Sequence, residues 1–163
     1  MQGGSHGARE DSERPLTERG VGQARAAGVA LERLDVAFEA VLFSPKVRAR
    51  QTAELAAEGW PADRRGRLAV HAPLAGGFDG AQALDAMASV GADGRLLMVG
   101  HEPDLSRVIA ELTGARVDLK KGGLAIVRLE GGNGELTVLM RPRELALIAD
   151  PTLRVVCPPP DGD

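Results

Sequence analysis

The feature that most constrains the fold is a pair of short apolar runs, each followed directly by a polar turn that contains proline. Ala40–Phe43 ends at Ser44-Pro45, and Leu96–Val99 ends at Gly100-His101-Glu102-Pro103. Four apolar residues are too few for a helix, so both runs predict short buried strands. A helical pattern follows each turn, and such alternation is typical of parallel sheets.

Apolar positions spaced three and four residues apart predict the helices. The first helix is capped by Thr17 and reaches Leu34, and it is one of four. The others run from Pro45 to Gly59, from Ala81 to Val90, and from Asp104 or Ser106 to Gly114. Residues 68–70 predict a weaker strand. The fold class is therefore α/β, with a mostly parallel sheet and helices on both faces.

The two ends of the chain differ from this alternating middle. Residues 6–14 are polar and charged, which predicts a loop before the first helix. Ala125–Leu129 and Leu136–Met140, joined by a glycine-rich stretch at 130–135, predict a C-terminal hairpin. We expect residues 1–150 to form a single domain and residues 151–163, which contain three consecutive prolines, to form a tail.

Length and composition exclude several classes of protein. The 163 residues fit one domain, and 20 Lys and Arg against 23 Asp and Glu give a net charge of −3, which offers no field for binding nucleic acid. No apolar run approaches the roughly 20 residues of a membrane span, and no signal peptide is recognisable. The single cysteine, Cys157, forms neither an internal disulfide nor a zinc site. We expect a cytoplasmic protein without cofactor or metal.

The turn after the first strand is a candidate anion site. Free N–H groups at the start of the following helix favour an anion, and Arg48, one turn in, can offer two guanidinium donors to phosphate or carboxylate oxygens. The alternative, equally compatible with the spacing, is that Arg48 and Arg50 solvate the outer face of the helix.

The turn after the second strand holds His101 directly after a glycine. A histidine at the end of a buried strand can face a ligand with an imidazole that titrates near neutrality, and can donate a hydrogen bond to a phosphoryl oxygen. The alternative is a histidine that caps a helix or closes the edge of the core.

Together, several segments resemble the histidine phosphatase superfamily. They occur in the family's order: Ser5-His6-Gly7, Asp11 through Gly20 with its Arg-Pro-Leu-Thr string, Ser44 through Thr52, and Val99 through Pro103. The chain is most similar to the small phosphohistidine phosphatase branch, which has the phosphoglycerate mutase-like fold. The resemblance runs from about His6 to the segment 141–145.

The resemblance implies a metal-independent phosphatase that acts on phosphohistidine in a protein or on a small phosphoester. His6 would be the nucleophile and form a phosphohistidine intermediate, which water then hydrolyses. Arg48 would bind the phosphoryl oxygens, assisted by Ser44, and His101 would donate a hydrogen bond to the same group. The stretch 72–79 contains no glutamate to serve as proton donor, as in the small branch.

The first motif departs from the family's Arg-His-Gly. Ser5 stands where the family has arginine, and no apolar strand precedes it. Arg9 or Arg14 could replace the missing arginine at the phosphate. A late start codon, a truncated gene or a rebuilt N-terminus would each explain the departure. In the family that strand lies inside the sheet, so its loss would leave unpaired backbone groups and exposed apolar surface on the neighbouring strands. Two further hypotheses follow: an inactive relative that binds phosphate or a phosphorylated protein, and a fragment without independent function.

Overall fold

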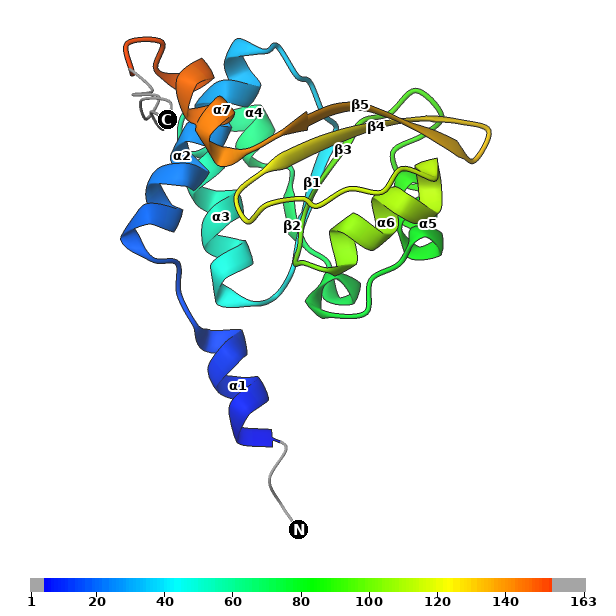
Figure 1. Ribbon diagram of the computed structural model, residues 1–163, viewed down its shortest axis with the longest axis horizontal. Coiled ribbons are helices and arrows are strands. Elements are labelled where there is room, and N and C mark those ends of the chain that lie inside the picture. Colours follow the sequence, from blue (N-terminus) through cyan, green and yellow to red (C-terminus); the bar gives the residue numbers. More distant parts are fainter. Residues whose placement is uncertain (1–4, 154–163) are drawn as a thin grey trace, which may run out of the picture.

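The computed structural model describes residues 5–153 of the chain. Figure 1 shows most of the helices gathered around the strands, while α1 projects away from the rest. The helices are α1 (Ser5–Glu13), α2 (Glu18–Arg33), α3 (Val47–Ala57), α4 (Ala62–Arg65), α5 (Gly80–Ala88), α6 (Asp104–Thr113) and α7 (Pro142–Ala149), with a 3₁₀ helix at Ala72–Ala75. The strands are β1 (Ala40–Phe43), β2 (Leu68–Val70), β3 (Leu96–Val99), β4 (Leu124–Glu130) and β5 (Asn133–Met140).

The described strands form two separate sheets. The first is parallel and three-stranded in the order β2-β1-β3, and the second is the antiparallel pair β4-β5. Val41 in the central strand pairs with Leu68 on one side and Leu97 on the other. The parallel sheet and the C-terminal hairpin are thus as the sequence predicted, and the carboxyl ends of β1 and β3 lie side by side.

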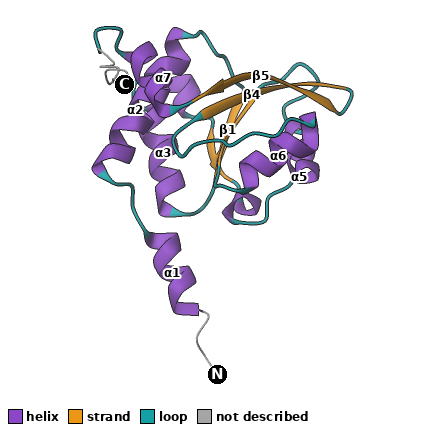
Figure 2. Ribbon diagram, in the orientation of Figure 1, coloured by secondary structure: helices purple, strands orange, loops and turns teal. Residues whose placement is uncertain are grey.

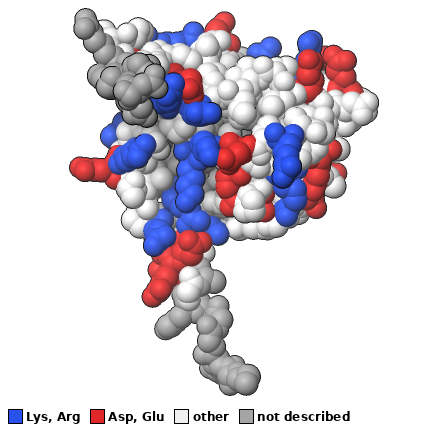
Figure 3. Space-filling view, in the orientation of Figure 1, with Lys and Arg blue, Asp and Glu red and all other residues white. Residues whose placement is uncertain are grey.

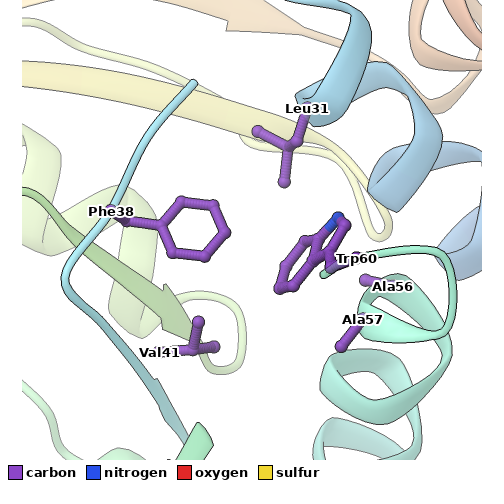
Figure 4. Packing of buried hydrophobic residues seen from close by; sticks show 6 residues of the cluster. All are labelled: Leu31, Phe38, Val41, Ala56, Ala57 and Trp60. Carbon is purple, nitrogen blue, oxygen red and sulfur yellow. The ribbon is translucent and has the colours of Figure 1, made fainter. Parts of the chain in front are cut away.

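Side chains of β1 and β3 alternate between two apolar clusters, which confirms that helices cover both faces of the sheet (Figure 2). Val41 and Leu97 pack with α2 and α3, around Leu31, Phe38 and Trp60 (Figure 4). Leu42 and Met98 face the opposite cluster, which is built on Leu74, Phe78 and Val108 from the α5 and α6 side. Burial on both faces explains why these strands are apolar throughout.

Helices α2 and α3 pack closely because α2 has a glycine at the contact. A Cβ on Gly28 would lie 1.9 Å from the carbonyl oxygen of Ala56. The indole N–H of Trp60 donates a 3.1 Å hydrogen bond to the Gly28 carbonyl. This contact fixes α3, and with it the side chains of its first turn, against the body of the domain.

The hairpin is longer than the sequence predicted. Its strands reach Glu130 and Asn133, so the turn consists of Gly131 and Gly132 alone. Both glycines have positive φ, at 56° and 88°, a conformation that two-residue hairpin turns require and that glycine adopts without strain.

The prediction of a loop over residues 6–14 is wrong, because residues 5–13 form α1. The segment has no apolar face to reveal a helix, but alanine, arginine and glutamate favour helices intrinsically. Helices α4 and α7 were not predicted either. For α7 the signals were present: Pro142 in the first turn, and Glu144, whose carboxylate accepts from the Arg141 N–H.

Parts of two further predictions lie outside the described residues. Only the first three residues of the predicted tail, 151–153, are described, and Cys157 is not. Over residues 5–153, no helix is both long enough and apolar enough to cross a membrane.

Candidate functional site

Ser44 directly follows the central strand β1 and connects the other residues of the site. It is fully buried, and its N–H donates to the carbonyl of Val99 at 3.0 Å, which extends the β1–β3 ladder by one residue. Its hydroxyl oxygen accepts the N–H of Lys46 at 3.2 Å and lies 2.7 Å from Nε2 of His101. The two strand ends that the sequence singled out therefore meet through a serine–histidine hydrogen bond.

His101 is half-buried, and its surroundings favour the neutral imidazole. Burial lowers the pKa of His101 below its usual value of 6.5, and the positive charges of Lys46 and Arg48 lower it further. The negative charges of Asp11 and Asp104 act in the opposite direction. A neutral ring carries one donor and one acceptor nitrogen, so His101 can exchange a proton with Ser44 or with a ligand.

Two cations stand at the N-terminal end of α3. Lys46 is the N-cap residue, and Arg48 lies in the first turn. Their side chains are 21% and 28% exposed, so both are partly desolvated yet open to solvent on one side. Free helix N–H groups add positive potential at the same place, and the combination favours an anion.

A carboxylate from α1 lies against both cations. Asp11 accepts hydrogen bonds from both Nη atoms of Arg48 and from Nζ of Lys46, each at 3.2 Å, and its carbonyl accepts a further one from Arg48 at 2.7 Å. The bonds from Arg48, followed by that from Lys46, lower the pKa of Asp11 below its usual value. The carboxylate of Asp11 thus already binds both Nη atoms of the Arg48 guanidinium.

The turn that carries His101 is fixed by α6. The His101 carbonyl accepts the N–H of Leu105 at 3.1 Å, and Glu102 accepts bonds from the N–H and the hydroxyl of Ser106. Asp104 in turn accepts the N–H of Phe78, a fully buried residue of the opposite cluster. The backbone that carries the imidazole is therefore fixed by hydrogen bonds to β1 before His101 and within α6 after it.

The donor set of the site is suited to an oxyanion. It comprises a guanidinium, an ammonium, an imidazole, a hydroxyl and a helix N-terminus, all of which can donate to phosphoryl oxygens. Among the described residues, no three His, Cys, Asp or Glu side chains are grouped to bind a metal ion.

Comparisons with known proteins agree with this chemistry. Residues 2–69 match the family described as the histidine phosphatase superfamily, branch 1. An uncharacterized protein of Picosynechococcus is 33% identical over 129 residues, covering 73% of this chain and 74% of that protein. The chain belongs to the histidine phosphatase superfamily. Within it, the similarity to solved structures points to the SixA-like branch.

Two solved SixA structures are similar to this histidine phosphatase relative along most of its length. The protein histidine phosphatase SixA complexed with tungstate superposes with a TM-score of 0.71 at 28% identity, covering 83% of this chain and 88% of that one. A SixA protein from Nakamurella multipartitia gives 0.68 at 28% identity, with 81% and 87% covered. The architecture is therefore that of the superfamily.

The superfamily motifs meet only in part. Ser44, Arg48 and His101 converge at the carboxyl ends of β1 and β3. Arg14 is exposed in the turn after α1, and it lines a shallow depression of about 170 Å³ with Gly7, Glu10 and Asp11. Its backbone N–H donates to the Asp11 carbonyl at 3.4 Å, but within residues 5–153 its side chain forms no hydrogen bond or ion pair with Ser44, Arg48 or His101.

His6 lies in the first turn of α1, and Figure 1 shows this end of the helix pointing away from the strands. It precedes Asp11 by five residues, or about 7.5 Å along a helix axis. The side chain of His6 is not among those described, so its role as nucleophile stays a prediction.

Two residues of the site, Lys46 and Asp11, were not among those predicted from the sequence. Lys46 stands in the same Ser44–Thr52 string as Arg48, and its position at the helix start was a usable signal. Asp11 gave no such signal, because its contact with Arg48 spans 37 positions in the chain and depends on how α1 is placed.

Proposed function

We propose that the chain is a metal-independent phosphatase that hydrolyses phosphohistidine, with a small phosphomonoester as a second candidate substrate. The observation that carries the proposal is the convergence of Ser44, His101, Lys46 and Arg48 at two adjacent strand ends. A phosphoryl group placed there would meet the Arg48 fork and the imidazole together. Membership of the superfamily supports this assignment of the site.

In the proposed reaction a nitrogen of His6 attacks phosphorus, and a P–N bond to the enzyme forms as the P–N bond to the substrate breaks. The leaving imidazole takes up a proton from the site or from water. Water then attacks the phosphohistidine, which releases inorganic phosphate and restores His6. Arg48 and His101 would stabilise the charge on the equatorial oxygens in both steps.

Substrate binding would require two changes at α1. The phosphoryl group has to displace the Asp11 carboxylate from Arg48, since both need the same guanidinium donors. The segment that carries His6 also has to turn toward the strand ends. If it does not, the remaining residues support the alternative function, a binding protein for phosphate or for a phosphorylated partner.

Phosphate release from a phosphohistidine peptide tests the proposal, with the His101→Ala, His6→Ala and His71→Ala variants measured beside the unmodified chain. His71 is the matched control, because its ring packs edge-on against Phe78, 6.0 Å between ring centroids, and takes no part in the hydrogen bonds that join Ser44, His101 and Arg48 in the described chain. Turnover should fall by roughly 100-fold or more in His101→Ala and be absent in His6→Ala, while His71→Ala retains it. Turnover in His6→Ala would remove His6 from the mechanism. Phosphate binding without turnover by the folded chain would establish the binding function instead.

A further inference from the structure

A second positively charged feature lies outside the proposed catalytic site. An open groove of about 710 Å³ runs between α2, the segment before β4 and the start of α7. Its walls include five cationic residues: Arg19, Lys120, Lys121, Arg141 and Arg143. We call this feature the basic groove. Figure 3 shows Lys and Arg side chains gathered in a band on this face, which continues toward the end where α1 joins the body.

The basic groove has an excess of positive charge, although the whole chain carries −3. Lys120 pairs with Asp118, and Arg143 pairs with Glu144 at 3.1 Å. The other three cations, Arg19, Lys121 and Arg141, form no ion pair within residues 5–153. Like charges that face one groove repel one another unless an anion lies between them, so the groove is complementary to a negatively charged ligand.

Glycines build the wall that carries the two lysines. Gly122 has φ of 77°, and a Cβ there would lie 2.9 Å from Oε1 of Gln23 and 3.3 Å from Pro142. A Cβ on Gly123 would lie 2.8 Å from the carbonyl of Lys120. The positive φ of Gly122 favours glycine, and the short contact at Gly123 leaves no room for a side chain, so the two glycines let the chain turn tightly after Lys121. Lys121 lines the groove together with residues of α2 and α7.

The basic groove opens at the same end of the molecule as the strand-end site. Helices α2 and α3 run in the same direction, because the chain entering α2 contacts the early part of α3: the Leu16 N–H donates to Oε1 of Gln51 at 2.8 Å, while Gly28 meets Ala56. Arg19, in the first turn of α2, is therefore at the same end as Arg48. One extended ligand can contact both places.

We propose that the basic groove binds an acidic segment of a protein partner. The same partner would present its phosphorylated histidine to Arg48 and His101; this part of the proposal rests on the proposed function. Between the cations the groove is lined by small residues such as Ala26 and Ala146, which accommodate the backbone and side-chain methylenes of an extended peptide. None of its lining residues is aromatic, which disfavours single-stranded nucleic acid, since that ligand needs stacking platforms.

The test measures fluorescence anisotropy of a labelled ten-residue peptide of Glu, Asp and Gly that carries no phosphate. The Lys121→Glu/Arg141→Glu variant should bind it roughly tenfold more weakly or worse. The control is Arg65→Glu/Arg95→Glu, which changes the net charge by the same amount at exposed arginines outside the groove. It should change affinity by less than about twofold, because distant surface charges are screened. Equal loss in both variants, or no binding by the unmodified chain, overturns the proposal.

Two further measurements distinguish an acidic protein segment from nucleic acid, and binding in the groove from catalysis at the strand ends. A single-stranded oligonucleotide of equal charge, bound more tightly than the peptide, would overturn the assignment to an acidic protein segment. With phosphohistidine peptides, the Lys121→Glu/Arg141→Glu variant should raise KM for a substrate with acidic flanks and leave kcat unchanged. Groove-dependent peptide binding by a chain without turnover would sustain the groove while refuting the proposed function.

Discussion

Two carboxyl-terminal strand ends and one N-terminal helix meet at Arg48, and they are held in very different ways. Ser44 and His101 are fixed by the β1–β3 ladder, by the burial of Ser44 and by the hydrogen bond from the Ser106 N–H to Glu102 at the start of α6. Helix α1, by contrast, reaches the same place with Asp11, whose side chain accepts hydrogen bonds from Lys46 and Arg48 and is 46% exposed. The region at the strand ends provides donors for an anion, and α1 provides the carboxylate that accepts from them in this structure.

Disrupting the packing of α2 against α3 should have the largest effect. Gly28→Ala places a methyl group where a Cβ would lie 1.9 Å from the Ala56 carbonyl, so α2 and α3 must separate. We expect a loss of about 3 kcal/mol in the free energy of unfolding, measured by urea denaturation. Gly22→Ala is the control, since nothing lies within 4 Å of its Cβ, and it should stabilise the chain by roughly 0.5–1 kcal/mol. Equal midpoints for the two variants would refute the close packing.

Removing the guanidinium should come next. Arg48→Gln eliminates both donors that a phosphate would share, so inorganic phosphate should bind roughly 10- to 100-fold more weakly by isothermal titration calorimetry. Arg50→Gln, in the same helix, is the control, because the Arg50 guanidinium lies 5.9 Å from the Phe43 ring and is exposed. Unchanged affinity in Arg48→Gln would place the anion site elsewhere.

The helix contact should give a smaller effect of opposite sign. Asp11→Asn removes the charge that competes for Arg48 and Lys46, so phosphate should bind roughly two- to fivefold more tightly. Glu10→Gln is the matched control, an exposed acid on the same helix that forms no ion pair in the described part of the chain. Weaker binding in Asp11→Asn would mean that Asp11 positions Arg48 for the ligand instead of competing with it.

The smallest effect concerns pH. Since the pKa of His101 is lowered on folding, the unfolded chain binds the proton more readily below about pH 6.5. Stability should therefore fall as pH decreases from 6.5 toward the folded-state pKa, and His101→Gln should lose this part of the dependence. Urea denaturation of both chains between pH 5 and 8 measures it. Parallel curves would show that the imidazole titrates as it does in the unfolded chain.

The strand ends could be predicted from the sequence, whereas the position of α1 could not. The strands followed from local patterns, because apolar runs of four residues with polar ends leave few alternatives. That Ser44 and His101 serve one site was implied by the resemblance to the histidine phosphatase superfamily. Helix α6 ends at Gly114, as predicted, and Gly114 has the left-handed conformation. The contact of Asp11 with Arg48 was not predictable, because it depends on a polar helix that no periodicity announces. The packing at Gly122 likewise depends on three segments that are distant in sequence.

The pairing of Leu124 with Met140 has a consequence for the basic groove. This pair closes the open end of the β4–β5 hairpin and brings the segment before β4 beside the segment after β5. Lys121 and Arg141 are therefore close together before any ligand binds. The entropy of bringing these residues together is lost when the hairpin closes, during folding and not during binding. An acidic ligand therefore meets charges that are already assembled, and its affinity reflects electrostatic attraction with little cost for ordering the receptor.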